Sequence, residues 1–349
     1  MKKAILLASI FILQMAGFAT AADCLPRLTA PGSFLNSPAQ WGMDSGPILD
    51  GFLELEVKGG AASILHGIDL SHHNDYVDYS ELARCGAEFA VVKMDKMFET
   101  HRNSLKAANI KVLPYHYLSV DSTKAKEFTA KPARFSGKSG GELPAADLKA
   151  LLEIAHARGT AQAQAFVSLY QQRMKDDDVS FDLAGLKGRF MILDVEEHFK
   201  DGVKSTAIQR QNFGRFYAAM LSSWVAEVKT SFPDAIIVFY TFPDIFTSYL
   251  QFARPEDNVV IHGLPVWLAR TRGDGSDFDL DNNKNLQRIC LSSAGGNRCI
   301  LHQYSHRALF GIDADKKNKK TVPPYHIDVD RLFKVKTVND QVGVQYVRE

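Results

Sequence analysis

The stretch that decides the fold is RFMILDVEEHF, Arg189–Phe199, in which an apolar run leads directly into acidic residues. A short apolar run bounded by charged residues is typical of a buried β-strand. Because side chains alternate along a strand, we expect Asp194 and Glu196 on one side and Val195 on the other. The sequence therefore predicts a strand that delivers two carboxylates to one pocket.

Short apolar segments of the same kind recur along the chain, separated by stretches with helical spacing. The predicted strands are 68–70, 89–94, 111–118, 189–196, 235–242, 264–270, 298–305 and 326–330. The predicted helices are 79–85, 104–109, 145–174 and 206–232. Alternation of this kind indicates βα units around a mainly parallel sheet. Eight strands predict an α/β fold, an irregular TIM-like (β/α) barrel with an N-terminal arm.

Acidic residues fall where such a barrel places its active site. Asp69 ends the first predicted strand, as Asp194 and Glu196 end the fourth, and barrel sites form at the carboxyl ends of the strands. Two close carboxylates do not ionise together, so one keeps a proton while the other carries charge. Cleavage of a glycosidic bond requires this division of roles. The alternative is that the carboxylates only begin a loop, since D-x-E tripeptides are common.

The first residues, MKKAILLASIFILQMAGFATA, combine a basic start, an apolar run and small residues, the pattern of a secretory signal peptide. We therefore divide the chain into a signal peptide (1–21), an N-terminal arm (22–64), a barrel domain (65–335) and a C-terminal tail (336–349). No other apolar stretch reaches spanning length, so we expect no membrane anchor. The predicted location is the periplasm or the extracellular space.

The charge balance and the cysteines indicate which classes of partner and which cellular compartment to expect. Lys and Arg number 41 against 40 Asp and Glu, with no basic block, which argues against a nucleic-acid partner. Export permits disulfides. Among three pairings we expect Cys290–Cys299, which closes a short polar loop, and Cys24–Cys85, which ties the arm down. A buried free thiol at Cys85 is the alternative.

The stretch HGIDLSHHNDYVDYS, His66–Ser80, raises the question of a metal site. A metal would need three or four converging ligands. Adjacent His72 and His73 should point to opposite sides of an extended chain, so only one can join Asp69. We therefore predict no metal and no other cofactor, and we expect His72 to form a hydrogen bond within the pocket.

Taken together and in order, these segments resemble glycoside hydrolase family 25, the Chalaropsis-type lysozymes. HGIDLSHHNDYVDYSEL is similar to the family's opening G-x-D-x-S-H-x-x-x-x-x-D-[WY]. It is followed by FAVVK, PYHYL, QAQAF, ILDVEE, VFYTF, VWLAR, HQYS and IDVDRL, across about residues 66–333. The resemblance implies an N-acetylmuramidase that cuts the β-1,4 bond between N-acetylmuramic acid and N-acetylglucosamine in peptidoglycan glycan strands. The resemblance does not identify an inhibitor or immunity protein as a partner.

The resemblance also implies roles for individual residues. Glu196 matches the general acid, Asp194 the first carboxylate of D-x-E, and Asp69 the aspartate of the opening motif. The D-x-E pattern is similar to that of retaining enzymes in which the substrate's own acetamido group attacks; attack by a protein carboxylate stays open. For the late aspartate, Asp328 of IDVDRL is favoured over Asp315 of GIDAD.

Substrate contacts are expected from side chains at or near strand ends, where aromatic faces could stack on sugar rings. They are His72, Tyr115, Tyr240, Trp267, Gln303, Tyr304 and Asp328. The chain departs from the family pattern in two places: KMDKM puts Lys96 at an acidic position, and HQYS puts His302 at an aromatic one. These two departures leave a catalytically inactive wall-binding module as one rival function, and a metal-dependent polysaccharide hydrolase or deacetylase is the other.

Overall fold

The computed structural model describes residues 64–121, 132–137, 140–175, 180–183, 186–197, 205–269, 284–291, 298–308 and 327–333. The predicted signal peptide, the predicted arm up to residue 63, and the predicted tail lie outside these ranges. Among the described residues, no helix has the length and apolar character that crossing a membrane demands.

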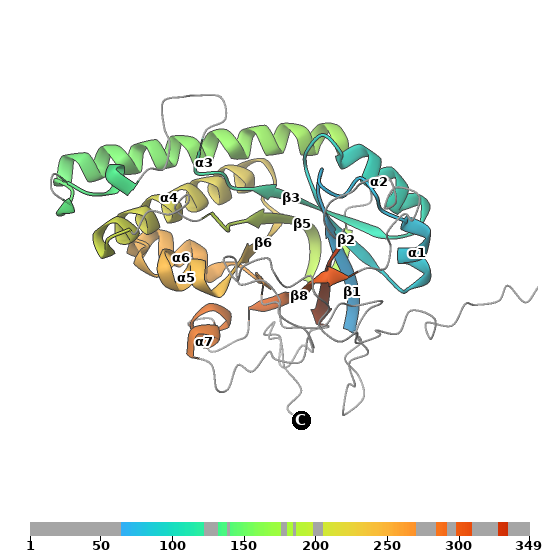
Figure 1. Cartoon of the computed structure of the whole chain (residues 1–349). Coiled ribbons are helices and arrows are strands. Elements are labelled where there is room, and N and C mark those ends of the chain that lie inside the picture. Colours follow the sequence, from blue (N-terminus) through green and yellow to red (C-terminus); the bar gives the residue numbers. More distant parts are fainter. Residues whose placement is uncertain are drawn as a thin grey trace, which may run out of the picture.

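The described strands form one sheet that closes on itself (Figure 1). They are β1 (Ile64–Leu70), β2 (Phe89–Lys93), β3 (Lys111–Tyr117), β4 (Ser180–Leu183), β5 (Leu186–Asp194), β6 (Ile236–Thr241), β7 (Val266–Ala269), β8 (Cys299–Ala308) and β9 (Ile327–Phe333). Their order is β3-β2-β1-β9-β8-β7-β6-β5-β4, and a further β3–β5 pairing closes the ring, leaving β4 outside it. Ring neighbours are parallel except β9, which is antiparallel to both β1 and β8. The predicted irregular α/β barrel is thus confirmed.

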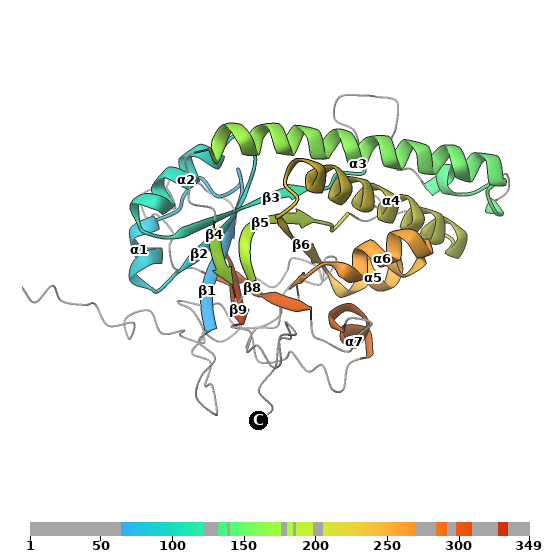
Figure 2. The same cartoon turned by 180° about the vertical axis from the view of Figure 1, so that it is seen from behind.

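Helices cover the outside of the sheet. They are α1 (Tyr79–Arg84), α2 (Phe98–Ala107), η4 (Pro132–Phe135), α3 (Ala145–Arg173), α4 (Ala207–Ser231), α5 (Pro243–Ser248), η6 (Leu250–Phe252), α6 (Pro255–Gly263) and α7 (Lys284–Cys290). The two long helices α3 and α4 run side by side (Figures 1 and 2). A capping box between Thr206 and Gln209 starts α4 by satisfying free backbone N–H groups.

Alternation along the strands separates two apolar cores. Phe190 and Ile192 of β5 pack inside the ring with residues of β2, β3, β6 and β7. Met191, Leu193 and Val195 pack outside it, in the core beneath the helices. This period of two fixes which side of the sheet each later residue faces.

The predicted Cys290–Cys299 disulfide is confirmed, with a Cα–Cα distance of 4.9 Å. It joins the end of α7 to the start of β8. Cys85 is buried and disulfide-bonded as well, whereas Cys24, its expected partner, lies outside the described residues.

Candidate active site

Carboxylates from β1, β5 and β9 gather at one end of the ring. Asp194 ends β5, and Glu196 follows two residues later. Val195 donates its backbone N–H to Tyr240 O at 3.0 Å, so the extended pairing continues past the strand end. Asp69 lies near the end of β1 and is in register with Asp328 of β9. Because β9 runs antiparallel, its second residue meets the carboxyl end of β1.

A hydrogen-bonded chain holds Asp69. Gln303 Nε2 donates to Asp69 Oδ2 at 2.7 Å, and Gln303 Oε1 accepts from Tyr240 Oη at 3.0 Å. Asp69 also shares a hydrogen bond with Asp328, which requires a proton on one of the two carboxyl groups. Burial raises the pKa of Asp69 to about 6 and that of Asp328 well above its usual value. Three strands thereby fix one acidic group.

Asp194 and Glu196 form the central pair. Asp194 is buried beside its register neighbours Tyr117 of β3 and Tyr240 of β6. Its Oδ1 is a buried atom without a hydrogen-bond partner among the described residues. Burial, followed by the charge of Glu196, raises the pKa of Asp194 well above its usual range. Burial, followed by the charge of Asp69, raises the pKa of Glu196 to about 7.

Glu197 lies outside this pair and anchors the chain. Its carboxylate accepts hydrogen bonds from Ser119 Oγ at 3.1 Å and from the Val120 backbone N–H. Its own N–H donates to Tyr217 Oη at 3.1 Å. Alternation along the strand is the signal that could have put Glu197 on the side of Val195, but its anchoring role depends on a distant loop and was not predicted.

Lys93 is a second residue that sequence reasoning missed. It ends β2, and its Nζ lies 4.5 Å from the ring centroid of Tyr117 and 5.9 Å from that of Tyr115. Its charge opposes the rise in the pKa of both Asp194 and Glu196. The alternation of FAVVK, with Val91 facing the barrel interior, was the available signal.

The histidines of the opening stretch lie differently from our expectation. His72 and His73 were expected on opposite sides, but their ring centroids are only 3.9 Å apart. The expectation was wrong because this segment forms a turn, closed by a hydrogen bond from Asn74 N to Ser71 O, and is not extended. His72 Nδ1 and backbone N both contact Asp95 Oδ2 at 2.9 Å. Contact of His72 with substrate stays a prediction.

The predicted aromatic contacts are mostly enclosed. Tyr115, Tyr240 and Trp267 are 8%, 5% and 2% exposed, so they line the barrel interior and offer little free surface. Trp267 Nε1 donates to Asp330 Oδ1 at 3.0 Å. His302 is buried and is therefore no open platform. The side chain of Tyr304 and all of Asp315 lie outside the described residues.

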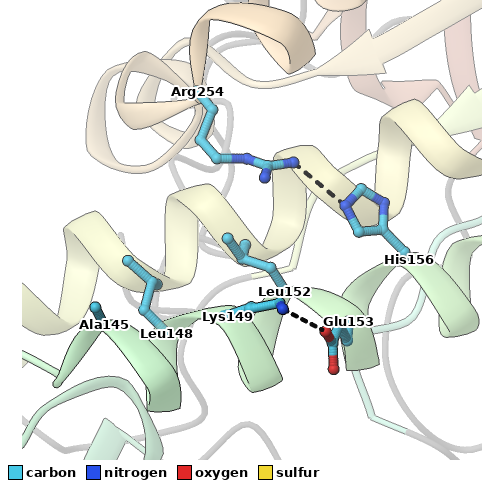
Figure 3. A pocket seen from close by; sticks show the side chains of 7 residues that line it. All are labelled: Ala145, Leu148, Lys149, Leu152, Glu153, His156 and Arg254. Atoms are coloured by element: carbon cyan, nitrogen blue, oxygen red, sulfur yellow. Dashed lines mark hydrogen bonds and ion pairs between the residues drawn. The ribbon is translucent and has the colours of Figure 1, made fainter.

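A separate hollow of about 430 Å³ lies between α3 and the start of α6 (Figure 3). Its lining residues are Ala145, Leu148, Lys149, Leu152, Glu153, His156 and Arg254. His156 Nε2 accepts a hydrogen bond from Arg254 Nη2 at 3.3 Å. None of the clustered carboxylates lines this hollow, so it is distinct from the candidate active site.

A closed barrel with paired acidic residues at the carboxyl end of its strands is an arrangement suited to cleavage of a glycosidic bond. Residues 68–181 match the family model described as Glycosyl hydrolases family 25, the family that the sequence motifs predicted. No curated protein sequence matches the chain.

Solved structures of lytic enzymes are also similar to the chain. A bacterial lysozyme from Streptomyces coelicolor is 15% identical, with 77% of this chain and 92% of that chain covered and a TM-score of 0.43. The spore cortex lytic enzyme of Clostridium perfringens is 16% identical, with 77% and 67% covered and a TM-score of 0.45. A family 25 lysozyme from Aspergillus fumigatus is 14% identical, with 77% and 94% covered and a TM-score of 0.42.

Proposed function

We propose that the protein is an exported peptidoglycan hydrolase that cleaves the β-1,4 bond between N-acetylmuramic acid and N-acetylglucosamine with retention. The observation that carries the proposal is the pair of buried Asp194 and half-buried Glu196 at the carboxyl end of the barrel, with the pKa of Glu196 raised to about 7. The family match over residues 68–181 supports the reaction class.

Glu196 is the proposed general acid and base. A carboxyl group whose pKa is about 7 is protonated in a large fraction of the molecules at neutral pH and can donate that proton to the leaving oxygen. The resulting carboxylate then accepts a proton from the attacking water. One residue thus serves both half-reactions of a retaining mechanism.

Asp194 is the proposed partner of the substrate's acetamido group. Its buried Oδ1 has no hydrogen-bond partner among the described residues, and an acetamido N–H would supply one. Such a donor favours the ionised form of Asp194 and lowers its raised pKa when substrate binds. The oriented acetamido oxygen would then attack the anomeric carbon, in place of a protein carboxylate.

Asp69 and Asp328 are proposed to complete the acidic surroundings, with Tyr240 and Gln303 holding Asp69 in position. Their shared proton limits the charge that builds up beside Asp194 and Glu196. The remaining predicted contacts, His72, Tyr115, Trp267 and Tyr304, are kept as proposed substrate-binding residues.

Export is proposed from the signal-peptide pattern of residues 1–21, which lie outside the described part of the chain. The Cys290–Cys299 disulfide supports an oxidising compartment. The periplasm or the extracellular space is also where a protein meets peptidoglycan.

Substitution of Glu196 by Gln tests the central assignment. The amide keeps the shape but cannot donate a proton, so turnover of purified peptidoglycan should fall by at least about 100-fold. Glu153→Gln is the matched control, because Glu153 is exposed on α3 and should leave turnover unchanged. Release of reducing ends measures the rate. More than a tenth of wild-type activity in Glu196→Gln would contradict the role of Glu196.

The products distinguish the finer alternatives. Mass spectrometry should find N-acetylmuramic acid at the reducing end of every fragment, and NMR should detect the β anomer first. A substrate without acetamido groups should not react. Turnover of that substrate would assign attack to a protein carboxylate, and activity lost with a chelator and restored by zinc would favour the metal-dependent rival.

A further inference from the structure

Lys93 brings a positive charge to the carboxylate pair. It lies on the inward-facing side of β2, because Phe89 and Val91 at the preceding alternate positions pack in the barrel interior. It pairs in register with Tyr115, which in turn pairs with Ile192, two residues before Asp194.

The side chain of Lys93 leans toward the mouth of the barrel. Its Nζ is 4.5 Å from the ring centroid of Tyr117 but 5.9 Å from that of Tyr115, its own register partner. Tyr117 is the register neighbour of Asp194. The ammonium therefore stands one layer above the backbone position of Lys93, in the layer that holds Asp194.

In the described ranges, the other ionisable groups that face the pair are carboxyl groups and phenols. The groups that face Asp194 and Glu196 are Asp69 of β1, Tyr115 and Tyr117 of β3, Glu197 after β5, Tyr240 of β6 and Asp328 of β9. Asp330 of β9 faces Asp69 and Asp328. His73 and His116 have lowered pKa values, for which burial is the largest cause and to which the charge of Lys93 contributes. Among the residues that the structure describes, Lys93 is thus the cation whose charge acts on both members of the pair.

We propose that Lys93 is a positioning residue for the proposed reaction, whose ammonium compensates one negative charge on the Asp194–Glu196 pair and so holds the pair in its singly ionised state. One carboxylate is then available to the acetamido group while the other keeps the proton for the leaving oxygen. A single cation offsets the first ionisation and leaves the second opposed by burial and by repulsion between the two carboxylates. The inference rests on the proposed function.

Replacement of Lys93 by Met removes the charge and should move both ionisations to higher pH. The acidic and the basic limbs of the kcat/KM profile should each shift upward by roughly one pH unit, the size expected for loss of a nearby opposite charge. Lys93→Arg keeps the charge and should restore the wild-type limbs. Lys111→Met is the matched control, since it removes an exposed charge at the opposite end of β3 and should leave both limbs in place.

A chemical rescue covers the case in which Lys93→Met does not fold. Lys93→Cys can be assayed before and after aminoethylation of the new thiol, which rebuilds a lysine-like cation within one folded preparation. The two limbs should return to their wild-type positions after modification. If Lys93→Met or unmodified Lys93→Cys lowers the rate but leaves both limbs of the kcat/KM profile in place, Lys93 has only a packing role. This result would overturn the inference. A wild-type protein that releases no fragments at all would instead contradict the proposed function.

Discussion

At the scale of single residues, the candidate site keeps several carboxyl groups out of water. Burial is the largest cause of the raised pKa of Asp69, about 6, and of Glu196, about 7. A buried carboxylate that lacks a full set of hydrogen-bond donors destabilises the folded state once it is charged. The proposed chemistry therefore has a cost in stability that depends on pH.

The sign of that dependence gives a prediction for Glu196→Gln. The folded protein binds the Glu196 proton more tightly than the unfolded chain does, because the pKa of this glutamate is about 4.5 in the unfolded chain and about 7 in the folded protein. The stabilisation of the folded state by the bound Glu196 proton is complete below a pH of about 4.5 and is lost as the pH rises through about 7. Because glutamine does not ionise, the melting temperature of the variant should fall less than that of the wild type between pH 5 and pH 8.

Differential scanning calorimetry at matched pH values measures this effect. At pH 8 the Glu196→Gln protein should melt above the wild type, whereas the exposed Glu153→Gln control should follow the wild-type curve. Parallel curves for wild type and Glu196→Gln would show that Glu196 ionises equally well in the folded and the unfolded protein.

The acidic residues of the site could be predicted from the sequence because their positions follow from local rules. Alternation after an apolar run places Asp194 and Glu196 together, and a strand end places Asp69, whereas Asp328 was favoured because of the resemblance of IDVDRL to the family pattern. The partners of these groups could not be predicted in the same way. Gln303 reaches Asp69 across 234 positions of sequence, and the ammonium of Lys93 is held against Tyr117 of another strand. Such contacts depend on how the ring closes.

At the scale of elements, the packing of α3 against α4 depends on Gly159. A Cβ atom built at Gly159 would lie 2.2 Å from Met220 O, a backbone atom of α4 that cannot turn aside. Glycine is unfavourable within a helix by about 1 kcal/mol relative to alanine, so its presence in the middle of α3 needs a reason in packing. The close approach of the two helices supplies that reason.

Gly159→Ala should therefore destabilise the protein despite its better helix propensity. The clash forces the two helices apart, and overpacking of this kind costs about 1–3 kcal/mol. Urea unfolding measures the change. Gly263→Ala, at the last residue of α6, has no atom within 4 Å of the added Cβ and should be neutral or slightly stabilising. Equal midpoints for the two variants would mean that α3 and α4 adjust freely.

The predicted elements agree with the structure where an apolar pattern is long or strongly alternating. All eight predicted strands overlap β1–β3 and β5–β9, and the segments 145–174 and 206–232 correspond to α3 and α4. The strand β4 and the short helices α5, α6 and α7 were not predicted. Each has four to nine residues, too few for a periodic pattern to stand out from the neighbouring turns.

At the scale of the whole molecule, β9 completes the ring. It pairs with β1 on one side and β8 on the other, and its Asp330 accepts the hydrogen bond from Trp267. The barrel could be predicted from eight strand patterns, but the direction of β9 could not, because an alternating pattern reads the same in either direction.

Two truncated chains test the predicted domain boundary at residue 335. A chain that ends at Val335 keeps β9 and should fold with wild-type secondary structure and activity. A chain that ends at Ala308 leaves β1 and β8 with unpaired edges and Trp267 without its acceptor, so it should aggregate or unfold. Circular dichroism and size-exclusion chromatography measure both outcomes. A soluble, compact shorter chain would show that β9 is dispensable for closure.

The antiparallel closing strand also governs when the molecule can first act. Asp69 is synthesised well before its register neighbour Asp328, which lies far later in the sequence. A chain whose synthesis has not yet reached β9 therefore has Asp194 and Glu196 but lacks the closed ring of strands around them. In the proposed enzyme, the ability to cut cell wall therefore arises only once β9 has paired with β1 and brought Asp328 beside Asp69.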